Sequence, residues 1–242
     1  MLWKKTWEPE SVLALIGGIA AAFLFGNVAA GVLRQAGVAG FRTDDSLGVV
    51  LVATLSFQGA AVALGTVFLK FHDAGWREVF GDAGWKRCLA LALAVLAAVA
   101  PVIFGLKFLS ESVLHWLHVP VADQRAVELL LSARTPWLSA YLVFFAVVLA
   151  PLGEEFFFRG LLFSTAKRYG WPKLGWVGVS LLFALIHLNA PTFLPLFVLA
   201  LALTWLYVKT EGLLAPVMAH SLFNAANLLL LACAQKHAPA SP

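Results

Sequence analysis

Two adjacent carboxylates and an arginine stand in the middle of a long apolar stretch. The stretch covers residues 137–166, and it contains Glu154, Glu155 and Arg159. Charged side chains inside such a segment are costly, so they usually pair with one another or mark a functional site. Glu155 and Arg159 are four residues apart, which places them on one face of a helix where they can pair. Glu154 lies about 100° further round that helix, so it is the carboxylate without a partner on its own helix.

Two later apolar stretches carry polar side chains that can assist hydrolysis. Residues 174–189 contain Phe183 and His187, and the last stretch contains His220 and Asn224, four residues apart. At a rise of about 1.5 Å per residue, Glu154 and His187 both lie about 20 Å from the loop that joins their stretches. His220 and Asn224 lie about 12 and about 18 Å from the next loop on the same side. We therefore expect the four side chains to meet below the middle of the bilayer.

A carboxylate, two histidines and an asparagine in one dry site are the groups needed to activate water. The carboxylate can take a proton from the water, and one histidine can help to hold that water. The donors of the other pair can stabilise an oxyanion. The pattern therefore predicts a hydrolytic site inside the membrane.

The composition is that of an integral membrane protein. Of the 242 residues, 61% are hydrophobic and only 12% are charged, whereas soluble domains contain about 25% charged residues. The apolar stretches are continuous and do not alternate in polarity, which predicts helices and excludes a transmembrane barrel. They cover residues 11–33, 47–69, 88–109, 137–166, 174–189, 191–208 and 213–234. We expect an all-α fold, a polytopic bundle of seven to eight transmembrane spans with the active site inside the bundle.

The segment 110–136 leaves the number of spans open. Pro120 interrupts it, and residues 124–134 have the pattern of a short amphipathic helix at the membrane surface. The alternative is that the segment enters the membrane as an eighth, partial span. In either case we expect one membrane domain, in which residues 1–136 form N-terminal spans and the interfacial helix and residues 137–234 form the catalytic core.

The distribution of basic residues predicts that the N-terminus is in the cytoplasm. With the N-terminus inside, ten lysines and arginines fall on the cytoplasmic side and six on the outer side, and cytoplasmic loops normally carry the excess. The ten are Lys4, Lys5, Lys70, Arg77, Lys86, Arg87, Lys167, Arg168, Lys173 and Lys209. The six are Arg34, Arg42, Lys107, Arg125, Arg134 and Lys236. Membrane topology accounts for these residues, so we expect no nucleic-acid partner.

This orientation also predicts how the site is reached. The loop 167–173 would lie in the cytoplasm, and we expect the catalytic cavity to open towards it. Cysteines at Ser164 and Ala219 would then react with impermeant reagents mainly from the cytoplasmic side. The expected location is the cytoplasmic (plasma) membrane.

Three motifs in this order resemble those of a known family. The motifs are Glu154-Glu155-x-x-x-Arg159, Phe183-x-x-x-His187 and His220-x-x-x-Asn224. They are similar to the motifs of the CPBP family, the CAAX proteases and bacteriocin-processing enzymes. The family is also called the Abi family and includes the type II CAAX prenyl endopeptidase. The resemblance covers residues 137–230 and implies an intramembrane endopeptidase.

The resemblance also implies a role for each motif residue. Glu154 would be the general base and His187 its partner in holding water, while His220 and Asn224 would stabilise the oxyanion. The supporting residues would be Glu155, Arg159 and Phe183. Although the family has been termed metalloproteases, the implied mechanism depends on glutamate and uses no metal or other cofactor. The alternative is a His₂Glu zinc site at Glu154, His187 and His220.

The implied partners are the lipid bilayer and a membrane-associated protein or peptide substrate, such as a prenylated CAAX-type tail or a leader-bearing precursor. Two other function classes stay open. A proton-coupled transporter also needs intramembrane Glu, His and Arg side chains, but it predicts polar residues through the full depth of several spans. A non-catalytic membrane scaffold or immunity protein would keep the same fold without cleaving anything.

Overall fold

The computed structural model describes residues 7–43, 46–121, 124–133 and 135–237, and within these ranges it contains helices and loops but no strand. Among these residues, three π-helical segments, labelled η, interrupt long helices. The elements are α1 (Pro9–Gln35), α2 (Leu47–Thr54), η2 (Leu55–Gly59), α3 (Ala60–Phe71), α4 (Trp76–Phe80), α5 (Trp85–Trp116), α6 (Arg125–Ser132), α7 (Pro136–Phe144), η3 (Phe145–Leu149), α8 (Ala150–Glu155), η4 (Phe156–Phe163), α9 (Ser164–Arg168), α10 (Pro172–Ile186), α11 (Ala190–Thr210) and α12 (Leu214–His237). The expected all-α class is confirmed for the described residues.

Six continuous helices among the described residues are long and apolar enough to cross a membrane. They are Pro9–Gln35, Leu47–Phe71, Trp85–Trp116, Pro136–Arg168, Ala190–Thr210 and Leu214–Cys233. This is the make-up of a multi-pass integral membrane protein. The count is below the expected seven to eight, because the stretch 174–189 forms α10, which has only 15 residues. A helix of that length measures about 22 Å, whereas the apolar core of a bilayer is about 30 Å thick.

A sharp turn between α10 and α11 explains why α10 is short. Leu188 has a positive φ of 47°, and Asn189 caps α11 by accepting a hydrogen bond from the backbone N–H of Thr192 at 3.2 Å. Pro191 lies in the first turn of α11, where proline is tolerated because no intrahelical N–H bond is needed there. The turn places His187 at the C-terminal end of α10, next to a helix that returns along the bundle.

The segment 110–136 contains no eighth span among its described residues. α5 continues to Trp116, and α6 is a helix of eight residues, much shorter than a membrane-spanning helix. Leu129 and Leu130 of α6 pack against Leu138 and Leu142 at the start of the next long helix. A short helix at the predicted place is therefore confirmed, and its position at the membrane surface stays a prediction.

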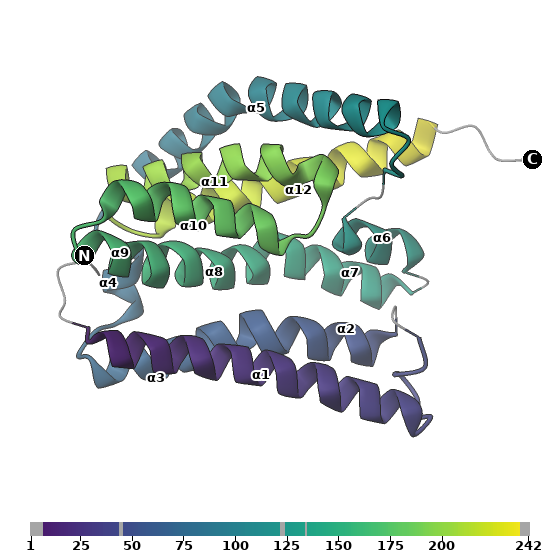
Figure 1. Cartoon of the computed structure of the whole chain (residues 1–242), viewed down its shortest axis with the longest axis horizontal. Coiled ribbons are helices and arrows are strands. Elements are labelled where there is room, and N and C mark those ends of the chain that lie inside the picture. The colour runs from purple at the N-terminus through teal and green to yellow at the C-terminus, as the bar shows by residue number, and fades with distance from the viewer. Residues whose placement is uncertain (1–6, 44–45, 122–123, 134, 238–242) are drawn as a thin grey trace, which may run out of the picture.

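The helix Pro136–Arg168 lies in the middle of the bundle. Figure 1 shows it between α1, α2 and α3 on one side and α5, α10, α11 and α12 on the other. Its residues Phe156, Phe158, Leu161 and Phe163 are all buried in the main apolar cluster of the protein. This central position is what brings Glu154 and Glu155 into contact with side chains from both groups of helices.

Candidate active site

Glu154 lies on α8 and is almost completely buried, with 8% of its surface exposed. Its Oε2 atom lies 3.9 Å from Nε2 of His220 on α12. Its Oε1 atom accepts a hydrogen bond of 3.5 Å from Nε2 of Gln58 on η2. Neither partner is a permanent cation, so the carboxylate remains able to accept a proton.

Glu155 and Arg159 form the predicted ion pair, which is confirmed. Arg159 Nη1 donates to Glu155 Oε1 at 2.8 Å, and both side chains are fully buried. Arg159 also donates to the carbonyl oxygen of Ala200 at 2.9 Å and to the hydroxyl oxygen of Thr204 at 3.3 Å. A guanidinium with these partners satisfies most of its donors and ties the central helix to α11.

Glu155 also holds His220, a contact that the sequence did not reveal. Oε1 of Glu155 lies 2.9 Å from Nδ1 of His220. The carboxylate accepts from Arg159 as well, so Nδ1 of His220 is the donor and carries the proton. Nε2 of His220 is thereby turned towards Glu154. While Nδ1 donates to Glu155, Nε2 can also donate a hydrogen bond only when the imidazole is protonated on both nitrogens.

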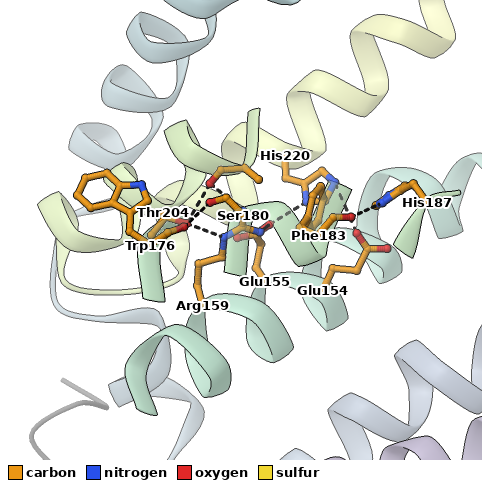
Figure 2. A network of polar contacts seen from close by, with 10 residues as sticks. Glu154, Glu155, Arg159, Trp176, Ser180, Phe183, His187, Thr204 and His220 are labelled. Atoms are coloured by element: carbon orange, nitrogen blue, oxygen red, sulfur yellow. Dashed lines mark hydrogen bonds and ion pairs between the residues drawn. The ribbon is translucent and has the colours of Figure 1, made fainter. Parts of the chain in front are cut away.

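The ring of Phe183 on α10 packs against the side chains of His187, His220 and Arg159. Its ring centroid lies 4.9 Å from that of His187 and 5.7 Å from that of His220. On another side, the guanidinium carbon of Arg159 lies 4.9 Å from the ring centroid. Phe183 is fully buried, and Figure 2 shows it beside both histidines, so its packing limits how they can move relative to each other.

His187 is oriented by its own helix. Its Nδ1 lies 2.7 Å from the carbonyl oxygen of Phe183, and because a carbonyl can only accept, Nδ1 carries a proton. Nε2 then has a free lone pair in the neutral imidazole. Figure 2 shows the side chains of His187 and Glu154 on the same side of His220.

Asn224 on α12 is oriented by the central helix. Its Nδ2 donates to the carbonyl oxygen of Ala146 at 2.7 Å. Ala146 belongs to η3, and π-helical segments often occur at functional sites. One N–H of the amide is used in this bond, and the second is available to another acceptor.

The four predicted catalytic residues line a single cavity of about 360 Å³. They are Glu154, His187, His220 and Asn224. Most of the remaining wall is apolar and comes from α2, α5, α6, the Pro136–Arg168 helix, α11 and α12. A hollow at the other end of the bundle, lined by charged residues of α4, the start of α5 and the end of α11, contains none of the four.

The cavity extends in the opposite direction from the one expected. On the central helix it is lined by Leu142, Phe145, Ala146 and Ala150, and by no residue between Glu154 and Arg168. It therefore runs from Glu154 towards Pro136, and the expectation that it opens towards the loop 167–173 is wrong.

The physical reason is the packing on the other side of Glu154. The space towards the loop 167–173 is filled by Phe156, Phe158 and Phe163, each at most 1% exposed. Ser164 and Ala219 are also buried, and Ser164 is hydrogen bonded to the hydroxyl of Tyr207 at 2.7 Å. Cysteines at these two positions would therefore not report on access to the site.

The described residues provide no ready metal site. Among them, no group of three or more His, Cys, Asp or Glu side chains is arranged to hold a metal ion. The alternative zinc ligands Glu154, His187 and His220 thus lie around one cavity without forming such a group. Nδ1 of each histidine is bonded to Glu155 or to the Phe183 carbonyl, which leaves Nε2 of both as the nitrogens that would hold such an ion.

The fold and the site together define a multi-pass membrane protein with a buried cluster of glutamates and histidines. Residues 136–226 match the family model described as type II CAAX prenyl endopeptidase Rce1-like. The chain therefore carries an Rce1-like domain of the CPBP family over these residues, and the resemblance seen in the three motifs is confirmed.

Two curated proteins are similar to part of the chain. The UPF0177 protein YxdF of Lactococcus lactis subsp. lactis (strain IL1403) is 31% identical over 78 residues, which are 32% of this chain and 42% of that protein. An Escherichia coli protein named "Uncharacterized 24.3 kDa protein" is 38% identical over 78 residues, 30% of this chain and 36% of that protein. The matched regions thus span less than half the length of either relative. No solved structure matches the chain.

Proposed function

We propose that this protein is an intramembrane endopeptidase that hydrolyses a peptide bond of a membrane-associated protein or peptide. The observation that carries the proposal is the cavity that Glu154, His187, His220 and Asn224 share, together with the position of all four residues within the Rce1-like domain. A buried carboxylate, an imidazole with a free lone pair and two hydrogen-bond donors match the requirements of peptide hydrolysis by activated water.

In the first step, a water molecule is held between the carboxylate of Glu154 and Nε2 of His187. Glu154 takes a proton from the water as the water oxygen forms a bond to the carbonyl carbon of the substrate. The carbonyl oxygen becomes an oxyanion, which accepts hydrogen bonds from Nε2–H of His220 and the free N–H of Asn224. Glu155 stabilises the doubly protonated His220 that this donation requires, because it faces Nδ1 at 2.9 Å.

In the second step, the tetrahedral intermediate collapses. The bond between the carbonyl carbon and the peptide nitrogen breaks, and Glu154 returns its proton to the leaving nitrogen. The products are a carboxylic acid and an amine, and Glu154 is again a carboxylate. The buried position of the cluster strengthens each of these interactions, because the surrounding dielectric is low.

The packing supports hydrolysis over proton-coupled transport. A transporter needs a continuous polar path on both sides of Glu154. Towards Arg168 the cavity does not continue, and the polar side chains of Arg159 and Ser164 are fully buried and bonded to protein partners. The proposed mechanism uses no metal. If active protein contained stoichiometric zinc, and activity disappeared with its removal and returned with its addition, the His₂Glu zinc alternative would replace it.

The substrate that we propose is a prenylated CAAX-type tail or a leader-bearing membrane protein. The test is to compare the peptide termini found in membranes that contain wild-type protein or Glu154→Gln. We expect one set of cleaved termini with wild type only, and the intact precursor to accumulate with the variant. Identical profiles would refute the proposed function and favour the scaffold. Glu111→Gln is the matched control, because Glu111 lines the same cavity from α5 and is paired there with Lys107.

We also propose that the N-terminus is in the cytoplasm, together with the loop 167–173. Because the cavity extends away from that loop, it would then open to the outer side. The motive is the ten-to-six excess of lysines and arginines that the sequence predicts for the cytoplasmic side. Lys4 and Lys5 of the ten, and Arg134 of the six, lie outside the described residues.

In a background lacking Cys88 and Cys233, Asn227→Cys should react with impermeant thiol reagents in intact cells. Tyr169→Cys should react only after the membrane is permeabilised. Asn227 is exposed and lines the cavity, and Tyr169 is exposed at the other end of the bundle.

The opposite labelling pattern would reverse the orientation. It would place the N-terminus outside and the cavity on the cytoplasmic side, with the substrate cut in the cytoplasm. A cysteine in the exposed N-terminal part of α1, such as Glu10→Cys, serves as a control, because the start of α1 lies at the same end of the bundle as α9, which Tyr169 follows (Figure 1).

A further inference from the structure

Gln58 is a polar side chain in the second long helix, Leu47–Phe71, which lies outside the Rce1-like domain. Its Nε2 lies 3.5 Å from Oε1 of Glu154. Among the described residues, it is the side chain that donates a hydrogen bond to Glu154. An amide inside an apolar span is costly, so its contact with the buried carboxylate of another helix calls for an explanation.

The local backbone is shaped to bring Gln58 to this position. Gln58 belongs to η2, a π-helical interruption between α2 and α3, and such interruptions are frequent at functional sites. On the central helix, the residue that precedes Glu154 is Gly153, which is buried. A Cβ at position 153 would lie 3.1 Å from both Cα and Cβ of Gln58, so any larger residue there would push Gln58 away by a few tenths of an ångström. A glycine next to the carboxylate thus permits the close approach of the two helices.

The contact distinguishes the two oxygens of Glu154. Oε1 faces Gln58 at 3.5 Å, whereas Oε2 faces Nε2 of His220 at 3.9 Å. A glutamate side chain has three rotatable bonds, so a buried carboxylate without a fixed donor can adopt several orientations. A neutral amide can hold one oxygen without forming an ion pair and without competing for the proton.

We propose that Gln58 is a positioning residue for Glu154. It holds Oε1 so that the carboxylate keeps the orientation in which it takes a proton from the attacking water. This proposal rests on the proposed function, in which Glu154 is the general base. It makes the N-terminal helices part of the active site, because the residue that orients the base comes from outside residues 136–226.

The test uses Gln58→Met, which has similar length but no donor, in a purified full-length protein. The probe is a quenched fluorescent peptide that contains the cleavage site found by the comparison of peptide termini. We expect kcat to fall about 10- to 100-fold, because small misplacements of a catalytic group have effects of this size. KM should stay within about twofold of the wild-type value, because an interaction needed only for the chemical step changes kcat and not substrate binding.

Two further variants separate positioning from a structural role. Ser56→Ala changes the same π-helical segment and should leave kcat unchanged, because Ser56 Oγ donates to the carbonyl oxygen of Ala53 and not to Glu154. In a Glu154→Gln background, Gln58→Met should cause no further loss, because the two residues act as a unit. The melting temperature of each variant in detergent is measured beside its kinetics.

The outcomes separate this proposal from the proposed function. Wild-type kcat in Gln58→Met, with Glu154→Gln inactive, would overturn the role of Gln58 and leave the proposed function intact. If kcat fell in both Gln58→Met and Ser56→Ala, in proportion to the drop in melting temperature of each variant, Gln58 would have a structural role instead. A raised KM with unchanged kcat would make Gln58 a substrate contact. Full activity of Glu154→Gln would overturn both proposals.

Discussion

Replacing Glu154 by glutamine should lower kcat about 10²- to 10⁴-fold, the range that general bases contribute. Glutamine has nearly the same size and shape, but it cannot accept a proton from water at neutral pH. The protein should still fold, because glutamine keeps the volume of the side chain and the contacts of Glu154 that it changes are long, at 3.5 Å to Gln58 and 3.9 Å to His220. The same peptide probe, assayed with purified wild type and variant, gives kcat and KM separately.

Glu111→Gln provides the matched control for this experiment. Glu111 also lines the cavity, but it is partly exposed and pairs with Lys107 at 3.7 Å. We expect its kcat to stay within about twofold of the wild-type value, since an exposed pair contributes about 1 kcal/mol or less. Equal losses of kcat in the two variants would show that activity depends on negative charge in the cavity in general and not on the particular position of Glu154. An active Glu154→Gln would exclude Glu154 as the base.

Replacing Arg159 by alanine should destabilise the protein by about 3–5 kcal/mol. This is the usual cost of removing one partner of a buried ion pair, because the remaining charge is left without compensation. Here the remaining group is Glu155, which is fully buried. The variant also loses the hydrogen bonds from Arg159 to Ala200 and Thr204. Denaturant or thermal unfolding of the detergent-solubilised protein measures the change in the free energy of unfolding.

Lys107→Ala is the matched control for Arg159→Ala. Lys107 and Glu111 have the same four-residue spacing as Arg159 and Glu155, but their side chains are 48% and 38% exposed. We expect this variant to lose about 0.5 kcal/mol or less, as exposed helical pairs do. If both substitutions had the same small effect, the buried pair would contribute nothing particular to the stability of the bundle.

The sequence by itself determined the features that depend on helical geometry within one segment. The pairing of Glu155 with Arg159 follows from their four-residue spacing, which any α-helix brings to one face. The convergence of Glu154, His187 and His220 followed from the constant rise per residue and the position of the loops. The all-α class followed from continuous apolar stretches, which only helices can satisfy in lipid.

The tertiary structure decided the features that depend on which helix faces pack together. Rise per residue gives the depth of Glu154 but not what fills the space around it, so the phenylalanines of η4 determined the direction of the cavity. The contact of Glu155 with His220 joins residues 65 positions apart, and that of Gln58 with Glu154 joins residues 96 apart. Such contacts depend on the rotation of each helix about its axis, which packing against neighbouring helices sets.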